Sequence, residues 1–126
     1  MQLLLFDDKN SWIDITDKFK IKVDYCTVKQ QIKLESMLGA YAKKAEEISE
    51  EEQLQLFFEY ATYYVKYHLK DWKGVTDGKK EIPFVLTNDE MDDKLWLGLV
   101  NNSDVFWKVF NAISNKLRFN AVDKKK

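Results

Sequence analysis

The sequence predicts an α+β fold that is mainly α, with a small N-terminal antiparallel sheet followed by about four helices. Three observations lead to this fold class. Polar and apolar residues alternate near the N-terminus, as they do in a half-buried strand. Further along the chain, apolar residues recur at steps of three and four, as on one face of a helix. Two of the four glycines and the only proline lie between Lys70 and Phe84, which indicates a hairpin-like loop between the second and third helices.

Length and composition indicate a single domain. The chain has 126 residues, of which 45% are hydrophobic and 14% aromatic, enough for one buried core. We expect residues 1–120 to form this domain and residues 121–126 to be a flexible basic tail. The net charge is only −1, which disfavours binding to nucleic acid or to an anionic membrane. The single cysteine, together with an apolar start too short for a signal peptide or a membrane span, favours a cytoplasmic protein.

The first 25 residues are predicted to form the sheet. In the run KFKIKVDY, residues 18–25, lysines alternate with apolar residues, so one side of a strand would be buried and the other solvated. The earlier run QLLLF, residues 2–6, is predicted to be a partner strand, and the polar residues after it a turn. The lysines form either a solvated strand face or a binding surface. This lysine row consists of Lys18, Lys20 and Lys22.

Capping patterns mark the starts of the first two helices. Thr27 with Gln30, and Ser49 with Glu52, have the spacing at which side chains satisfy the free N–H groups of a first turn. The first helix is predicted to bury one face. The residues of that face are Leu34, Met37, Leu38, Tyr41, Ala45 and Ile48.

The second helix is predicted to run to about Lys70 and to carry two apolar stripes. Either this helix is central and both stripes are buried, or the tyrosine-rich stripe binds a second copy of the chain or a helical partner. We name the tyrosine stripe as the candidate partner-binding surface. The core stripe consists of Leu54, Phe57, Phe58, Ala61, Val65 and Leu69. The tyrosine stripe consists of Leu56, Tyr60, Tyr63 and Tyr67.

Two further helices are predicted near the C-terminus. Thr87 with Glu90 repeats the capping pattern and predicts a short third helix through MDDKLWLGLV. The polar run at residues 101–103 breaks it, and Ser103 can cap a final helix. The apolar face of that helix consists of Phe106, Val109, Phe110, Ile113 and Leu117.

The residues that carry catalysis or bind metals are scarce. One cysteine and one histidine cannot supply the usual ligands of a zinc site, and TDGKKE lacks the alternating acidic ligands of a calcium loop. We expect His68 to sit at the edge of the core stripe, and Cys26 has no visible base beside it. The prediction is therefore a protein that is not an enzyme, with no catalytic, metal-binding or cofactor-binding residues.

The loop after the second helix is predicted to be structural. Asp77 and Gly78 form a strong turn dipeptide. Trp72 and Phe84 would anchor the two ends of the loop in the core, and Pro83 would make its exit rigid. The structural loop residues are Trp72, Gly74, Val75, Asp77, Gly78, Pro83 and Phe84.

The order helix, DWKGVTDGKKEIPF, helix resembles a segment of the tail assembly chaperones of long-tailed bacteriophages. In that family a Trp-x-Gly-Val turn leads through Asp and Gly to Pro-Phe and then to a helix start. The resemblance covers about residues 64–99. It implies a cofactor-free assembly factor of the host-cell cytoplasm, which binds the largely helical tape measure protein before the tail tube polymerises. Exposed aromatic residues, such as those of the tyrosine stripe, would contact this client.

Three other functions remain open. One is a small structural virion protein, such as a tail or head-tail joining subunit, which would also self-associate. Another is a phage-encoded interaction or inhibitor domain that acts on a host protein. The third is a slow hydrolase that uses His68 or Cys26.

Overall fold

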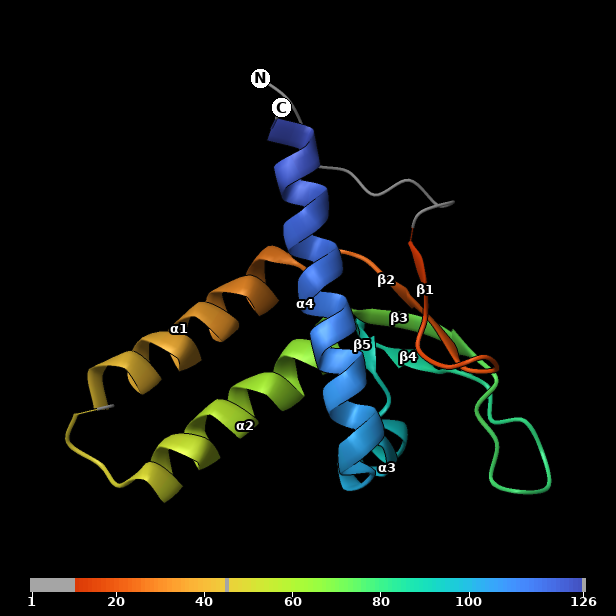
Figure 1. Cartoon of the computed structure of the whole chain (residues 1–126), viewed down its shortest axis with the longest axis horizontal. Helices are drawn as coiled ribbons and strands as arrows, with labels where there is room; N and C mark the ends of the chain where they lie inside the picture. The colour runs from red at the N-terminus through yellow and green to blue at the C-terminus, as the bar shows by residue number, and fades with distance from the viewer. Residues whose placement is uncertain (1–10, 45, 126) are drawn as a thin grey trace.

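The computed structural model describes residues 11–44 and 46–125, with side chains as far as Leu117 in the last helix. The predicted fold class is confirmed, because a three-stranded antiparallel sheet is followed in the described chain by four helices (Figure 1). The predicted strand QLLLF and its turn lie outside the described residues, as does Ala45. The elements are β1 (Trp12–Asp14), β2 (Lys20–Val23), α1 (Val28–Lys44), α2 (Glu50–His68), β3 (Leu69–Lys73), β4 (Leu86–Thr87), β5 (Glu90–Met91), α3 (Asp93–Asn101) and α4 (Ser103–Lys125).

The alternation predicted for residues 18–25 is confirmed. Phe19, Ile21 and Val23 are buried, and the lysine row lies on the solvent side of the strand. β2 is the central strand of the sheet, with β1 and β3 antiparallel on either side of it. Ile21 pairs with Ile13 of β1 and with Trp72 of β3. The lysine row therefore covers the outer face of the sheet, while the inner face contributes to the core.

The second helix is shorter than the periodicity predicts. α2 ends at His68, not near Lys70, and the chain continues directly into strand β3. Leu69 has extended backbone angles (φ −78°, ψ 121°) and pairs with Val23, next to a register shift in the ladder. The backbone N–H of Asp24 also donates to the carbonyl of His68 (3.2 Å). Pairing with a strand far back in the chain thus overrides the local helical pattern, as tertiary contacts commonly do.

The capping box predicted at Thr87 and Glu90 is wrong. These two residues pair with each other across a tight hairpin formed by β4 and β5. Asn88 (φ 53°) and Asp89 (φ 64°) occupy its turn, and both residue types tolerate positive φ. The third helix, α3, begins after this hairpin, with Asp92 as its N-cap.

The predicted last helix is present as α4, but Ser103, expected as its cap, is its first residue, and the N–H of Phe106 donates to the carbonyl of Asn102 (2.8 Å). The helix continues to Lys125. Its backbone therefore includes residues 121–125, the segment expected to be a flexible tail. Of the predicted apolar face, Phe106, Val109 and Ile113 are fully buried, and the other two members are half-buried.

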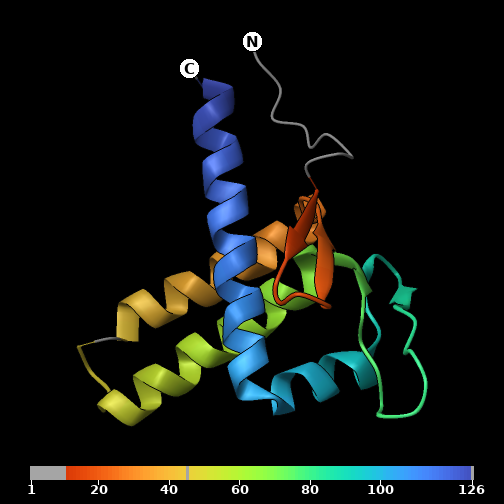
Figure 2. The same cartoon turned by 45° about the vertical axis from the view of Figure 1, so that its right-hand side comes forward.

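α1 and α2 form an antiparallel helical hairpin, here called the arm, which projects away from the sheet (Figures 1 and 2). Both predicted caps are present, since the N–H of Gln30 donates to Thr27 Oγ1 (3.2 Å) and that of Glu52 to Ser49 Oγ (3.2 Å). The buried face predicted for α1 is present only in part. Among its described members Leu34 is buried, Leu38 is exposed and the others are half-buried, because α1 packs on α2 and extends beyond the core.

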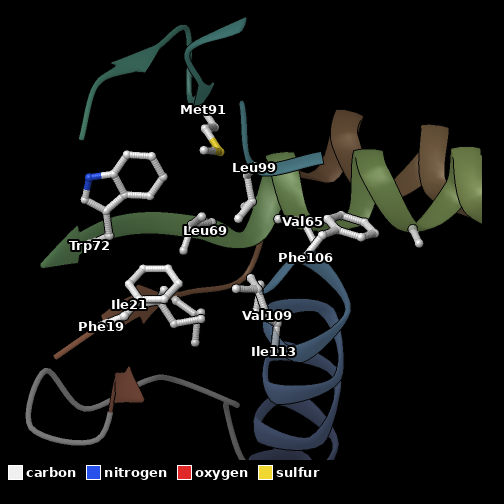
Figure 3. Packing of buried hydrophobic residues seen from close by; sticks show 12 residues of the cluster. Phe19, Ile21, Val65, Leu69, Trp72, Met91, Leu99, Phe106, Val109 and Ile113 are labelled. Carbon is white, nitrogen blue, oxygen red and sulfur yellow. The ribbon is translucent and has the colours of Figure 1, made fainter. Parts of the chain in front are cut away.

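The core lies where the sheet, the second half of α2 and the first half of α4 meet. Figure 3 shows these side chains pointing toward one another, with Met91 and Leu99 closing one side. Trp72 of β3 belongs to this cluster and packs edge-on against Phe19 and Phe84. Its indole Nε1–H donates to the carbonyl of Ile82 (2.7 Å). A single side chain therefore joins the sheet to the loop that follows it.

We predict that Trp72→Ala lowers the free energy of unfolding by about 3–5 kcal/mol, the usual cost of removing a buried tryptophan. Trp72→Phe should cost less, because it keeps an aromatic ring and loses the hydrogen bond to Ile82. Urea denaturation followed by circular dichroism measures both variants. Equal stability of Trp72→Ala and the native chain would mean that the loop is not anchored to the core.

Candidate functional site

The loop after β3 begins at a position that only glycine can fill. Gly74 has φ +83°, and an added Cβ would lie 1.8 Å from the backbone oxygen of Lys18. The chain therefore passes directly against the turn that precedes β2. This contact fixes the direction in which the loop leaves the sheet.

The predicted hairpin-like loop is present. Thr76 and Glu81 form a bridge, and the N–H of Ile82 donates to the carbonyl of Val75 (2.7 Å). At the tip, the carboxylate of Asp77 accepts from the backbone N–H groups of Lys80 (2.8 Å) and Lys79 (2.9 Å). These hydrogen bonds lower the pKa of Asp77. Gly78 follows with φ +96°, while Pro83 is exposed and Phe84 half-buried.

A hollow of about 500 Å³ lies between this loop and α3. Its walls are mainly apolar and include Phe19, Trp72 and Leu99. Lys94 is the one ionisable residue that lines it. The other described residues that line it are apolar or uncharged, and they come from the turn before β2, from the loop and from α3 and its flanks.

His68 lies in the core, where its chemistry is constrained. Burial lowers its pKa to about 4, which leaves the ring neutral at physiological pH. Nδ1 lies 2.8 Å from the carbonyl oxygen of Tyr64, so the neutral ring donates from this nitrogen. The ring also packs on that of Tyr64, with centroids 4.3 Å apart. His68 therefore holds the end of α2 together as a neutral hydrogen-bond donor.

Cys26 lacks the properties of a nucleophile. Burial raises the pKa of its thiol, which favours the unreactive protonated form. Its Sγ lies 3.5 Å from Oε1 of Gln31, an acceptor that cannot remove a proton as a base does. Burial also lowers the pKa of nearby Lys70 and raises that of Tyr64. Within the described residues, no cluster of three or more histidine, cysteine or acidic side chains could hold a metal ion.

The tyrosine stripe faces the interior more than solvent. Tyr67 is buried, whereas Tyr60, Tyr63 and Leu56 are half-buried. Tyr63 packs against Trp96 of α3 (5.2 Å between centroids). Lys33 of α1 places its ammonium group over the Tyr63 ring (4.1 Å). α1 and α3 thus cover much of the predicted partner-binding surface.

The core stripe of α2, in contrast, is uncovered at one end. Ala61, Val65 and Leu69 are fully buried, but Phe58 is 36% exposed and Leu54 is 70% exposed. The four of these residues that belong to α2 share one helix face, so exposure increases along that face toward the tip of the arm. The N-terminal part of α2 therefore extends beyond the core.

Aromatic rings surround this exposed end. Phe57 stacks on Trp107 of α4 (6.3 Å, interplanar angle 3°), and Phe58 lies 5.9 Å from the same ring. Tyr41 of α1 contacts Phe57 from the other side (6.0 Å). We call this surface the arm patch. It consists of Tyr41, Leu54, Phe57, Phe58 and Trp107.

Sequence reasoning assigned the exposed residues of the arm patch to the core. Periodicity identifies which residues share a face, but it does not show where along a helix the covering elements end. One local signal was present: three glutamates, residues 50–52, lie in the first turn of α2, shortly before Leu54. Such a strongly charged first turn indicates that the start of this helix lies in solvent.

Comparisons with protein-family models, with curated proteins and with solved structures found no match to this chain. In the part of the chain that the structure describes, no helix has both the length and the apolar character needed to cross a membrane. The candidate functional site is therefore identified from geometry alone. The arm patch combines two exposed apolar side chains, Leu54 and Phe58, with three half-buried aromatic side chains from α1, α2 and α4.

We predict that replacing glycine by alanine has opposite effects on stability at Gly74 and at Gly39. Gly74→Ala should lower the free energy of unfolding by about 2 kcal/mol or more, because of its positive φ and the clash with Lys18. Gly39→Ala should raise it by about 0.5–1 kcal/mol, since Gly39 is helical and has no atom within 4 Å of an added Cβ. Thermal unfolding of both variants provides the comparison. A stabilising Gly74→Ala would contradict the close approach described here.

We also predict that stability decreases in acid because of His68. Its pKa is about 4 in the folded chain and near 6.5 when unfolded, so the unfolded state binds the extra proton between these values. The contribution is complete above pH 6.5 and is lost as the pH falls to about 4, amounting to roughly 3 kcal/mol. His68→Asn keeps a donor but cannot titrate, so its stability should vary less over this range. If the stability of His68→Asn and that of the native chain depend on pH in the same way, His68 is not the cause of the loss of stability in acid.

Proposed function

We propose that this protein is a non-enzymatic tail assembly chaperone of a long-tailed phage or prophage, which holds the helical tape measure protein in the host cytoplasm until the tail is built. The observation that carries the proposal is the core stripe of α2, which continues beyond the core and leaves Leu54 and Phe58 in solvent. A chaperone needs apolar surface that its own core does not consume. The resemblance of residues 64–99 to this family is the reason for proposing the tape measure protein as the client.

The arm patch suits recognition of an amphipathic helix. Aromatic rings provide large contact areas with little loss of side-chain entropy. Phe57 and Phe58 are held by ring contacts to α4, so much of their ordering occurs when the chain folds and not when it binds. An apolar helix face could then lie against the arm, as in other helix-in-groove complexes.

The ionisable groups support a binding function over catalysis. His68 donates to a backbone carbonyl, Cys26 has a raised pKa, and Lys66 is paired with two carboxylates. Each of these groups contributes to the structure of the domain. A function that depends on surface shape and apolar contact needs none of them to change protonation state.

We predict that Leu54→Ser weakens binding to the tape measure protein from the same genome about tenfold, since a large apolar contact is lost at the centre of the surface. Leu54 is exposed, so its replacement should change the free energy of unfolding by no more than about 0.5 kcal/mol. Ile32→Ser is the matched control, because Ile32 is an equally exposed aliphatic residue on α1, outside the arm patch.

Co-purification of the two proteins, followed by titration calorimetry, measures these effects. Unchanged affinity in Leu54→Ser would exclude the arm patch as the binding surface. Recovery of this chain from purified mature particles would instead favour a structural tail or head-tail joining subunit. Capture of a host enzyme with no tail component would favour a domain that acts on a host protein.

A further inference from the structure

The exposed half of the arm carries more negative than positive charge, because its glutamates outnumber Lys43 and Lys44 at the end of α1. Between Ala45 and Val65 the sequence has six glutamates and no lysine or arginine. The glutamates lie in the turn that joins the two helices and along the first half of α2, on both sides of Leu54. A partner that approaches the arm patch therefore meets a negative potential around an apolar centre. The glutamates are Glu46, Glu47, Glu50, Glu51, Glu52 and Glu59.

A hollow in the arm combines both properties. It has a volume of about 420 Å³ and lies between α1 and α2. Tyr41, Leu54 and Phe57 form its apolar walls, and Glu50 and Gln53 supply its polar lining. A lysine or arginine side chain matches this combination, because its aliphatic stem packs on apolar groups while its charged end pairs with a carboxylate.

A second hollow repeats the pattern on the tyrosine-stripe side of α2. Its volume is about 390 Å³, and Ile48 and Leu56 are its aliphatic members. Three glutamates line it together with Lys44, so carboxylates outnumber cations there as well. The charge preference of the arm is therefore not confined to one side of the helix.

We propose that the arm selects amphipathic helices whose apolar face is bordered by lysine or arginine. The apolar face covers Leu54 and Phe58, and a basic side chain from its border enters the hollow beside Glu50. This inference rests on the proposed chaperone function, because it defines which client segment the same surface binds. Charge complementarity of this kind increases association rates and excludes segments with acidic borders.

Two synthetic helical peptides test the proposal. They share one apolar face and differ only in the bordering residues, which are lysine in one and glutamate in the other. Fluorescence anisotropy with the full chain should show binding of the lysine-bordered peptide at least about tenfold tighter at low ionic strength. This preference should decrease in 0.5 M salt, where charges are screened beyond about 4 Å. Equal affinities for the two peptides would overturn the proposal.

Variants locate the effect on the arm. Glu50→Gln should reduce the preference for the lysine-bordered peptide about threefold to fivefold and leave the affinity for the other peptide unchanged or slightly higher. Glu35→Gln is the control, because Glu35 lies on α1 and its contact with Gln31 (3.2 Å) can be kept by an amide oxygen. An equal effect of the two variants would show that net charge, and not the hollow beside Glu50, sets the preference.

The outcomes separate this inference from the proposed function. Binding of the tape measure protein through Leu54, without any preference between the peptides, would overturn the charge selection and retain the chaperone. A clear preference for the lysine-bordered peptide without binding of the tape measure protein would support the selection of basic-bordered helices. It would contradict the proposal that the tape measure protein is the client. Sedimentation of the chain alone tests the other occupant: a dimer abolished by Leu54→Ser would show that a second copy covers the arm, which would overturn the selection of a separate helix.

Discussion

The buried ammonium group of Lys66 is the interaction on which the arrangement of the helical part depends. Its Nζ lies 2.6 Å from Asp93 of α3 and 3.4 Å from Glu90 of β5, and it sits over the Trp96 ring (4.2 Å). Desolvation opposes its charge, but the hydrogen bond to Asp93 and the two carboxylate charges outweigh that effect and raise its pKa. Leaving this largely covered ammonium group without partners would be destabilising, so these contacts favour the packing of α2, β5 and α3 against one another.

This constraint divides α2 into two halves with different roles. In the second half, Lys66 and His68 are tied to other groups, and Trp96 donates to the carbonyl of Thr62 (2.8 Å). The first half has α1 along one side, and the Phe106, Trp107 and Phe110 rings of α4 contact its apolar stripe. One continuous amphipathic helix is therefore part of the core in its second half and an exposed surface in its first half. The apolar stripe changes from buried to exposed where the core ends.

Sequence patterns predicted most of the fold because their causes are local. The alternation of residues 18–25 and the caps at Thr27 and Ser49 depend on neighbours in the chain, and the structure contains both. The errors have non-local causes. β3 is extended because it pairs with β2, and the spacing of Thr87 and Glu90 fits a cap and a two-residue hairpin equally well. The arm patch could not be predicted for the same reason, since its exposure depends on where the covering elements end.

The loop after β3 and the tip of the arm lie on opposite sides of the molecule (Figures 1 and 2). They are joined by the continuous segment from α2 into β3, in which His68 and Leu69 mark the change from helix to strand. Trp72 and Gly74 fix that strand to the sheet and to the turn before β2. The loop and the arm are therefore connected through the sheet and the core. A sequence pattern in the loop can therefore describe the framework without describing the exposed surface of the arm, which is formed by different residues.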